Sequence, residues 1–360
     1  MCYTYLYHEL IGGDDMRIFE HFQKGVNLGG WISQFAKYDQ DHFETFITRK
    51  DIEYIASLGF DHVRVPVDYN VLEDEAGEPI ESGFLYLRNC LEWCKEYKLH
   101  MLIDLHECYG YSFDPLKKDM DRRAFFYDEA LQARFFKLWT RIAKEFQNDQ
   151  DIVAFEPLNE VVLQEVSDAW NGIVKKYIRL IRSICPNTYI VVGGVMYNHV
   201  SNVKLLDPPA DDKIVYNFHC YEPFLFTHQG AYWVDYMPSD FRIQYPLPIE
   251  EYRRISKEAI DVSNGVIFLD EVKELGPQFF EIIFRDAIEA AAKYDVPLYC
   301  GEYGAIDLSD NASKINWLRD IHTAFKNHGI GRALWNYKEK DFGFVDESFA
   351  EVKDDFIAVL

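Results

Sequence analysis

Two glutamates follow short apolar runs at distant points of the chain. The run 152–160 ends in Asn159 and Glu160, and the run 296–302 ends in Glu302. Apolar runs of this length, bounded by turn-forming residues, are typical of buried strands, so both acids are expected at strand ends. Two carboxylic acids that meet at such a place have the chemistry of a general acid/base and a nucleophile.

Other apolar runs also end in, or contain, polar or aromatic residues. Arg64 lies inside the β-branched run 62–67, and a charge in that setting is rarely buried without a partner, so we expect it to pair with a site carboxylate. His219 and Tyr221 are two residues apart on a predicted strand and therefore point to the same side. The full candidate set is Arg64, His106, Asn159, Glu160, His219, Tyr221, Glu302 and Trp335.

The elements that must position these residues alternate between strand and helix. Strands are predicted at about 24–31, 62–67, 101–106, 152–160, 189–193, 214–221, 296–302 and 331–337. Helices are predicted at about 48–58, 82–97, 128–147, 168–185, 277–294, 312–327 and 347–358. This alternation predicts an α/β fold, a (β/α)8 TIM barrel, whose active sites lie at the C-terminal ends of the strands.

The domain organisation follows from the same spacing. We expect residues 1–24 to be an N-terminal extension and residues 25–360 to form the catalytic domain. The stretch at about 222–275 scatters aromatic residues among prolines and is too long for an ordinary barrel connection. It is predicted to be a small subdomain inserted after the sixth strand.

Composition restricts the class of partner. The 360 residues are 48% hydrophobic, enough for one large core, and 37 basic against 60 acidic residues give a net charge of −23. That charge opposes binding to nucleic acid or to an anionic membrane and favours a neutral substrate. We expect a monomer.

Targeting signals and cysteine spacing bear on location. No apolar stretch of about 18 residues and no signal-peptide pattern occurs, so the sequence predicts a cytoplasmic protein or one released by a non-signal route. The seven cysteines lack metal-type spacing and are expected to be free thiols.

The pair of carboxylates favours hydrolysis of a glycosidic bond. The chain lacks a phosphate-binding loop, the glycines of a dinucleotide site and a nucleophilic serine elbow. Arg64 near Glu302 would keep Glu302 charged, while Glu160 near an ionised partner would have a raised pKa. His106 and His219 are each single, without the paired spacing of a metal site, so we predict no metal and no cofactor.

The ordered set of site residues resembles glycoside hydrolase family 5 over nearly the whole chain from about Gly25. The family's recurring strand-end residues correspond in order to Arg64, His106, Asn159-Glu160, His219-Cys-Tyr221, Glu302 and Trp335. The resemblance implies a retaining mechanism with Glu160 as acid/base and Glu302 as nucleophile, without a cofactor. It also implies that Trp335 forms the floor of the subsite for the reacting sugar.

Several segments are similar to the cellulase and lichenase type of that family. They are residues 25–34, 46–48, 90–94, 226–229 and 334–338. This implies a retaining endo-β-glucanase for β-1,4-glucan or mixed-linkage β-1,3-1,4-glucan. Residues 107–123 and the inserted segment differ from that pattern, so a β-mannanase or an exo-β-1,3-glucanase on the same barrel stays an alternative. A non-catalytic glucan-binding barrel is disfavoured because both acids are intact.

Aromatic residues make up 16% of the chain, enough to line a sugar-binding groove. Each ring near a predicted strand end is equally compatible with a place in the core. The candidate sugar-stacking residues are Trp31, Tyr109, Tyr111, Phe224, Phe226 and Trp233.

Overall fold

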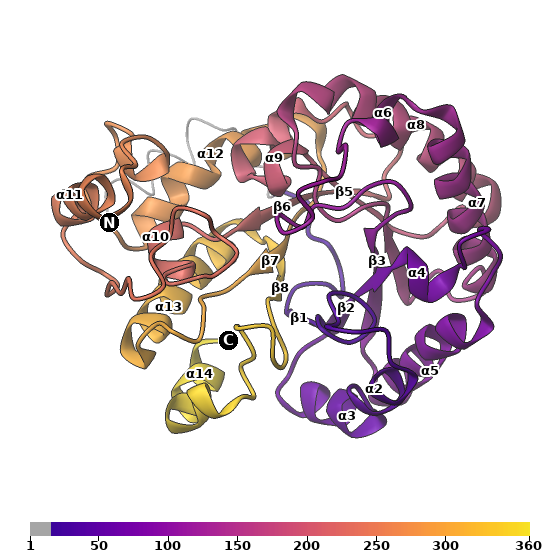
Figure 1. Cartoon of the computed structure of the whole chain (residues 1–360), viewed down its shortest axis with the longest axis horizontal. Helices are drawn as coiled ribbons and strands as arrows, with labels where there is room; N and C mark the ends of the chain where they lie inside the picture. Colours follow the sequence, from indigo (N-terminus) through magenta and orange to yellow (C-terminus); the bar gives the residue numbers. More distant parts are fainter. Residues whose placement is uncertain (1–15) are drawn as a thin grey trace.

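The centre of the structure is a closed barrel of eight parallel strands that follow one another in sequence order (Figure 1). The computed structural model describes residues 16–360. The strands are β1 (Gly25–Asn27), β2 (His62–Asp68), β3 (His100–Glu107), β4 (Val153–Glu156), β5 (Ile190–Gly193), β6 (Ile214–Cys220), β7 (Leu298–Tyr303) and β8 (Gly331–Leu334). Because β8 also pairs with β1 in parallel, the predicted (β/α)8 barrel is confirmed.

Helices surround the barrel and connect the strands (Figure 1). The long ones are α3 (Arg49–Ser57), α5 (Glu81–Tyr97), α7 (Glu129–Glu145), α8 (Ser167–Ile184), α11 (Ile249–Ile260), α12 (Pro277–Tyr294) and α13 (Asn311–His328). The short ones are α2 (Gln40–Thr45), α4 (Tyr69–Leu72), α6 (Ala124–Tyr127), α9 (Val195–Asn198), α10 (Phe224–Thr227), α14 (Lys353–Val359), η1 (Gln164–Val166), η2 (Val200–Leu205), η3 (Val266–Phe268) and η4 (Glu347–Val352). Within residues 16–360, no helix is long and apolar enough to cross a membrane.

Local signals in the sequence set the ends of the helices. The Asp128 side chain accepts hydrogen bonds from the N–H groups of Ala130 and Leu131 and so caps α7. Gly329 adopts a left-handed conformation with φ 61° and ends α13. These capping residues place the helix boundaries within a few residues of the predicted ones.

The fourth strand is shorter than predicted. It ends at Glu156, because the next residue, Pro157, has no N–H group to continue the ladder. Asn159 and Glu160 therefore lie in the loop after β4 and not on the strand itself. Trp335 likewise follows the last residue of β8, Leu334.

Part of the predicted N-terminal extension belongs to the barrel. Residues 1–15 lie outside the described part of the chain, but Phe19 and Phe22 are buried and stack with ring centroids 4.1 Å apart. They pack against inward-facing strand residues such as Leu102 and Tyr299. The two rings thus close the barrel at the end opposite the carboxyl ends of the strands, and the domain begins before residue 25.

The long segment between β6 and α12 contains α10, α11 and η3. The Tyr245 N–H donates to Ser313 Oγ at 2.8 Å, and the Tyr245 hydroxyl donates to Asp320 at 2.9 Å, so the segment is attached to α13. Its buried side chains, among them Phe226 and Tyr252, belong to the main hydrophobic core. The inserted segment therefore shares its core with the barrel.

The cysteines in the described part of the chain are free and buried, as expected. The Sγ of Cys185 donates to the carbonyl of Ala143 at 3.3 Å, which is a packing contact inside the core. Cys2 lies outside the described residues. The free cysteines are Cys90, Cys94, Cys108, Cys185, Cys220 and Cys300.

Substitution of Phe226 tests whether this ring is part of the core. Its side chain has 0% exposed surface and lies between Tyr245 and Trp317, with ring centroids 5.4 and 6.5 Å away. Phe226→Ala should lower the free energy of unfolding by about 3–5 kcal/mol, measured by urea denaturation. Phe226→Leu should cost less because it leaves a smaller cavity. An unchanged stability in Phe226→Ala, with an increased KM for glucan, would assign the ring to substrate binding.

Candidate active site

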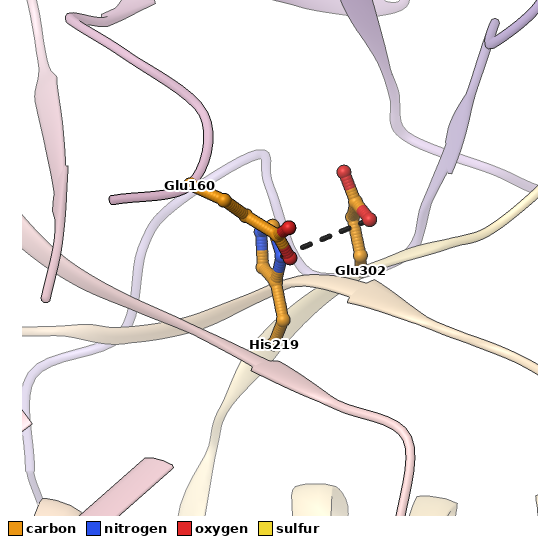
Figure 2. Close-up of side chains that lie close together, drawn as sticks. All are labelled: Glu160, His219 and Glu302. Atoms are coloured by element: carbon orange, nitrogen blue, oxygen red, sulfur yellow. Dashed lines mark hydrogen bonds and ion pairs between the residues drawn. The ribbon is translucent and has the colours of Figure 1, made fainter. Parts of the chain in front are cut away.

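Glu160, His219 and Glu302 meet at the carboxyl ends of the strands (Figure 2). His219 is in β6 and Glu302 in β7, and the two residues are partners in the sheet register. Glu160 reaches them from the loop after β4. All three are buried but retain a few per cent of exposed surface, so they sit at the base of the barrel mouth.

Arg64 is the buried cation that holds the carboxylates of the site. Its side chain is fully buried, and its Nε and Nη2 donate to both oxygens of Glu156 at 2.8 and 3.1 Å. Its Nη1 donates to Glu302 at 2.8 Å, and Nη2 lies 3.0 Å from Asp104. Nη2 also donates to the Asn159 side-chain oxygen at 2.8 Å. The predicted pairing of Arg64 with a site carboxylate is confirmed.

Glu302 is held by groups that stabilise its charged form. Besides Arg64 at Oε1, the hydroxyl of Tyr221 donates to Oε2 at 3.0 Å. His219 Nδ1 lies 3.7 Å from the same oxygen. One oxygen is thus fixed by a cation and the other by a hydroxyl, which orients the carboxylate towards the mouth.

Glu160 is oriented by a neutral histidine. His219 Nδ1 lies 2.7 Å from Glu160 Oε1, and His219 Nε2 lies 3.4 Å from Asn198 Nδ2. Asn198 Nδ2 also donates to the Asn159 carbonyl at 2.7 Å, which fixes its amide with the NH2 group towards His219. Nε2 therefore accepts, and Nδ1 carries the proton that it donates to Glu160. Burial lowers the pKa of His219 well below its usual value, consistent with the neutral ring.

Burial acts on both glutamates in the same direction, and the contact with Arg64 distinguishes Glu302 from Glu160. Burial raises the pKa of Glu160 well above its usual range, and the negative charge of Glu302 raises it further. Burial also raises the pKa of Glu302, although the Arg64 guanidinium opposes this. The raised pKa of Glu160 agrees with the prediction from the sequence. For Glu302, where Arg64 was expected to keep the group charged, burial raises the pKa more than Arg64 lowers it. The shared proton belongs on Glu160, because only Glu302 has a cation beside it.

Two further acids lie beneath this pair. Burial raises the pKa of Asp104 to about 7 and that of Glu156 to about 7, in each case against the opposing charge of Arg64. Both side chains are fully buried, and both contact the guanidinium. Arg64 therefore compensates several carboxylates at once.

Two buried polar side-chain atoms of this group have no hydrogen-bond partner within residues 16–360. Burial lowers the pKa of His106 to about 3, and its Nδ1 lies 2.6 Å from Asp104, so Nδ1 carries the proton and Nε2 is left as an acceptor. The amide nitrogen of Asn159 is left as a donor. The ring of Trp335 lies parallel to His106 at 5.8 Å. An acceptor, a donor and a flat ring are the groups that a sugar requires.

The glutamates and His219 also have a spacing that a cation could bridge. One ligand atom from each lies within 4.8 Å of the others. However, His219 Nδ1 donates to Glu160 and Nε2 accepts from Asn198, so neither nitrogen has a free lone pair for a metal. Arg64 already supplies positive charge to Glu302. The hydrogen bonds of His219 to Glu160 and Asn198 therefore account for both of its ring nitrogens without a metal.

Comparison with known proteins identifies the family. The model of the cellulase family, glycosyl hydrolase family 5, matches residues 22–341. The chain belongs to glycosyl hydrolase family 5.

Relatives and solved structures agree with this assignment. The chain is 40% identical to endoglucanase C of Acetivibrio thermocellus, over 94% of this chain and 98% of that protein. It is 37% identical to cellodextrinase A of Ruminococcus flavefaciens, over 94% and 92% of the two chains. The cellulose synthase subunit Z of Clostridioides difficile has the same fold, with a TM-score of 0.74 at 20% identity over 94% of this chain and 99% of that one. The family 5 chain is therefore a glycoside hydrolase.

Three of the predicted sugar-stacking residues are core residues. Trp31, Tyr111 and Phe226 have at most 1% exposed surface, so their faces are covered by protein. Trp31 Nε1 donates to the Phe43 carbonyl at 2.7 Å. The Tyr111 hydroxyl donates to the Glu160 carbonyl at 2.6 Å, so this ring supports the acid's loop. The prediction was wrong for these three, because strand-end position alone does not show which way a ring points.

The other three candidate rings keep some exposure. Tyr109 is 40% exposed, but the Arg134 guanidinium lies 3.7 Å from its ring centre. Phe224 is half-buried and stacks on His228 with centroids 4.2 Å apart. Trp233 is also half-buried and packs at the edge of the cluster that contains Trp335. Of the six, Trp233 packs beside the cluster that contains Trp335, and its contact with a sugar stays a prediction.

Sequence reasoning missed several residues that support the family 5 site. Glu156 and Asp104 are charged residues within apolar runs, the same signal that identified Arg64. Asn27 donates to the Gly301 carbonyl at 2.9 Å and accepts from Arg64 at 2.9 Å. Asn198 has no sequence signal, because its position depends on an unusual turn after β5.

Replacement of Arg64 should reveal how strongly the buried carboxylates depend on it. Arg64→Met leaves Asp104, Glu156 and Glu302 without a cation, and the free energy of unfolding should fall by about 3–5 kcal/mol. The loss should be larger at alkaline than at acid pH. Without Arg64 the folded-state pKa values rise further above the unfolded ones, so the folded variant takes up more protons as the pH falls and recovers stability. Urea denaturation over a pH series measures both effects.

A surface arginine provides the control for this variant. Arg141 pairs with Glu145 and Glu81, and its side chain is 31% exposed. Arg141→Met should change the stability by less than about 1 kcal/mol, with little dependence on pH. Equal losses in the two variants would contradict a special role for Arg64.

Proposed function

We propose that the chain is a retaining endo-β-glucanase that hydrolyses β-1,4-glucan or mixed-linkage β-1,3-1,4-glucan by double displacement. The observation that carries the proposal is the separation of the acids, with one oxygen of Glu160 and one of Glu302 within 4.8 Å. Retaining glycosidases have carboxyl groups about 5 to 5.5 Å apart, whereas inverting enzymes need about 6.5 to 9.5 Å to admit water. The short distance supports direct attack by a carboxylate.

In the first step, Glu302 attacks and Glu160 protonates. An oxygen of the Glu302 carboxylate forms a bond to the anomeric carbon while the bond to the glycosidic oxygen breaks. Glu160 gives its proton to that oxygen, and the leaving sugar departs with a new hydroxyl. Asn159, His106 and Trp335 would hold the reacting sugar.

In the second step, Glu160 acts as a general base instead of a general acid. Glu160, now ionised, takes a proton from water, and the water oxygen attacks the anomeric carbon. The bond to Glu302 breaks and its carboxylate is restored beside Arg64 and Tyr221. Two displacements at one carbon return the original β configuration.

The choice of a glucan rests on the relatives and on charge. The relatives at 40% and 37% identity bear the names endoglucanase and cellodextrinase, which describe enzymes that act on glucans. A net charge of −23 favours a neutral polysaccharide over an anionic one.

The deciding experiment is hydrolysis of barley mixed-linkage glucan, with the products sized and their anomeric form followed by NMR. Oligosaccharides released first as the β-anomer, with activity unchanged by a chelator, are the expected result. Release of the α-anomer would refute the retaining mechanism. Carboxymethylcellulose, mannan and laminarin are tested in parallel. Cleavage of mannan or laminarin alone would change the substrate assigned to the enzyme, while the fold and the roles proposed for both glutamates would stand.

Removal of either glutamate should abolish turnover. Glu160→Gln and Glu302→Gln should each lower kcat on glucan by several orders of magnitude, because neither residue can fill the other's role. The control is Glu165→Gln, an exposed acid a few residues after Glu160 that pairs with Arg123 on the surface. It should keep parental activity. Normal turnover in either site variant would overturn the assignment.

The pH dependence of kcat/KM should reflect the pKa values of Glu160 and Glu302. Activity needs Glu302 ionised and Glu160 protonated, so kcat/KM should be bell-shaped. Because burial raises both pKa values, both limbs should lie above the range of free carboxyl groups. The basic limb should disappear in Glu160→Ala when the substrate is an aryl glycoside whose leaving group needs no proton. Persistence of that limb would show that another group controls it.

A further inference from the structure

The strand that carries Glu302 contains a β-bulge at Gly301. The register of β7 with β6 passes from Cys300 directly to Glu302 while β6 advances by one residue, so Gly301 is an extra residue on β7. Within the described strands, the register with β8 gives Gly301 no partner either. A bulge of this kind bends its strand and changes the direction of the next side chain, and bulges are common beside active sites.

The bulge determines which side of β7 Glu302 faces. Successive side chains of a strand point to opposite sides, and Tyr299 faces the barrel interior. A regular strand would therefore place the following odd-numbered residues inside and Glu302 outside. Instead, Tyr303 packs outside the barrel against Phe325 of α13, with ring centroids 5.2 Å apart, and Glu302 points into the mouth (Figure 2). The extra residue thus reverses the alternation and brings the proposed nucleophile into the site.

Two buried asparagines bond to the peptide groups of Gly301. The Gly301 N–H donates to Asn217 Oδ1 at 2.9 Å, and Asn27 Nδ2 donates to the Gly301 carbonyl at 2.9 Å. Both asparagines have 0% exposed surface. A buried N–H or C=O group without a partner is costly, and the extra residue of a bulge loses its partners in the ladder. The two amides supply hydrogen bonds in place of the neighbouring strands.

The same two side chains are bonded to the charged groups beneath the site. Asn27 Oδ1 accepts from Arg64 Nη1 at 2.9 Å, and this nitrogen also donates to Glu302 at 2.8 Å. Asn217 Nδ2 donates to Glu156 at 2.8 Å. Because both ends of each amide are bonded, each asparagine has one orientation. The backbone before Glu302 and the carboxylate of Glu302 are therefore fixed by one network.

This network requires a glycine at position 301. A Cβ atom there would lie 2.8 Å from Asn217 Oδ1 and 2.9 Å from Asn217 Nδ2, closer than a carbon atom can approach. Any side chain at this position would displace the amide from its two partners. The glycine, the bulge and the two asparagines therefore depend on one another.

We propose that Asn27 and Asn217 are positioning residues, which hold the bulge at Gly301 and thereby aim the Glu302 carboxylate at the anomeric carbon. The proposal rests on the proposed glycosidase function and adds two residues that act through the backbone of β7. Without their hydrogen bonds, the strand would relax towards regular alternation and turn Glu302 away from the substrate. A misplacement of about 1 Å at a reacting atom costs on the order of 100-fold in rate.

The test measures attack by Glu302 separately from proton transfer. The probe is 2,4-dinitrophenyl 2-deoxy-2-fluoro-β-cellobioside, whose leaving group needs no proton and whose sugar stays on the nucleophile long enough to be found by mass spectrometry. The rate constant of labelling reports attack, and its concentration dependence reports binding. Asn27→Ala and Asn217→Ala should each slow labelling roughly 10- to 100-fold, with the half-saturating concentration within about threefold of the parent.

The matched control is a buried asparagine outside the barrel. Asn171 lies in α8, and its amide donates to the Leu205 carbonyl at 2.9 Å. Asn171→Ala also removes a buried amide, but it should leave the rate constant of labelling unchanged. This rate constant does not depend on the fraction of folded chains, so partial unfolding cannot imitate the effect. If one of the two site variants does not fold, the other carries the test.

A double variant separates the hydrogen bond from the need for space. Gly301→Ala should slow labelling because the added Cβ displaces the Asn217 amide. Combining it with Asn217→Ala removes the clash without restoring the hydrogen bond, so the double variant should be as slow as Asn217→Ala. A return to the parental rate in the double variant would show that the glycine only provides space, and it would refute the role of Asn217.

Failure of the positioning role can be told apart from failure of the proposed function. If the parent is not labelled, or is labelled at a residue other than Glu302, the retaining mechanism itself is wrong. If the parent is labelled at Glu302, a labelling rate within about twofold of the parent in either asparagine variant refutes the role of that residue. The role is also refuted by a change confined to the half-saturating concentration, or by an equal loss of rate in Asn171→Ala.

Discussion

The active site depends on one buried guanidinium. Arg64 contacts Asp104, Glu156 and Glu302, which come from three different strands, and it has no exposed surface. A single buried carboxylate would take up a proton to avoid the cost of desolvation. Three of them around one planar cation can share its charge, because the guanidinium donates in several directions within its plane. The cation therefore sets both the packing of the barrel interior and the charge of the site.

The two glutamates are supported in different ways, and this difference agrees with the roles proposed for them. Glu302 lies within β7 and is held through its carboxylate, by Arg64 and Tyr221. Glu160 lies in a loop that is held mainly through its backbone, with the Tyr111 hydroxyl at its carbonyl. Within residues 16–360, the hydrogen-bond partner of its carboxyl group is a neutral histidine, His219. Contacts at the carboxylate stabilise charge, whereas support at the backbone leaves the carboxyl group free to carry and release a proton.

Much of this arrangement could be predicted from the sequence, because it depends on strand ends. The period of the apolar runs identified the barrel, and parallel strands bring residues such as Arg64 and Glu302 to one end of it. Side-chain direction could not be predicted in the same way. Tyr111 and Phe226 follow strands as Trp335 does, yet they have at most 1% exposed surface, whereas Trp335 keeps 6%. Their direction depends on loops, whose conformation is fixed by long-range hydrogen bonds that no local pattern contains.

The turn after β5, formed by Met196, Tyr197 and Asn198 with positive φ values, shows this limit most clearly. None of these residues is a glycine, so the sequence gives no sign of a left-handed backbone there. The turn forms because distant partners, Asn159 and Val161, offer hydrogen bonds that offset the strain. Since those partners flank Glu160, the acid and the turn stabilise each other's position. The loop that carries Glu160 and the turn after β5 are thus a single unit, built from two connections of the same barrel.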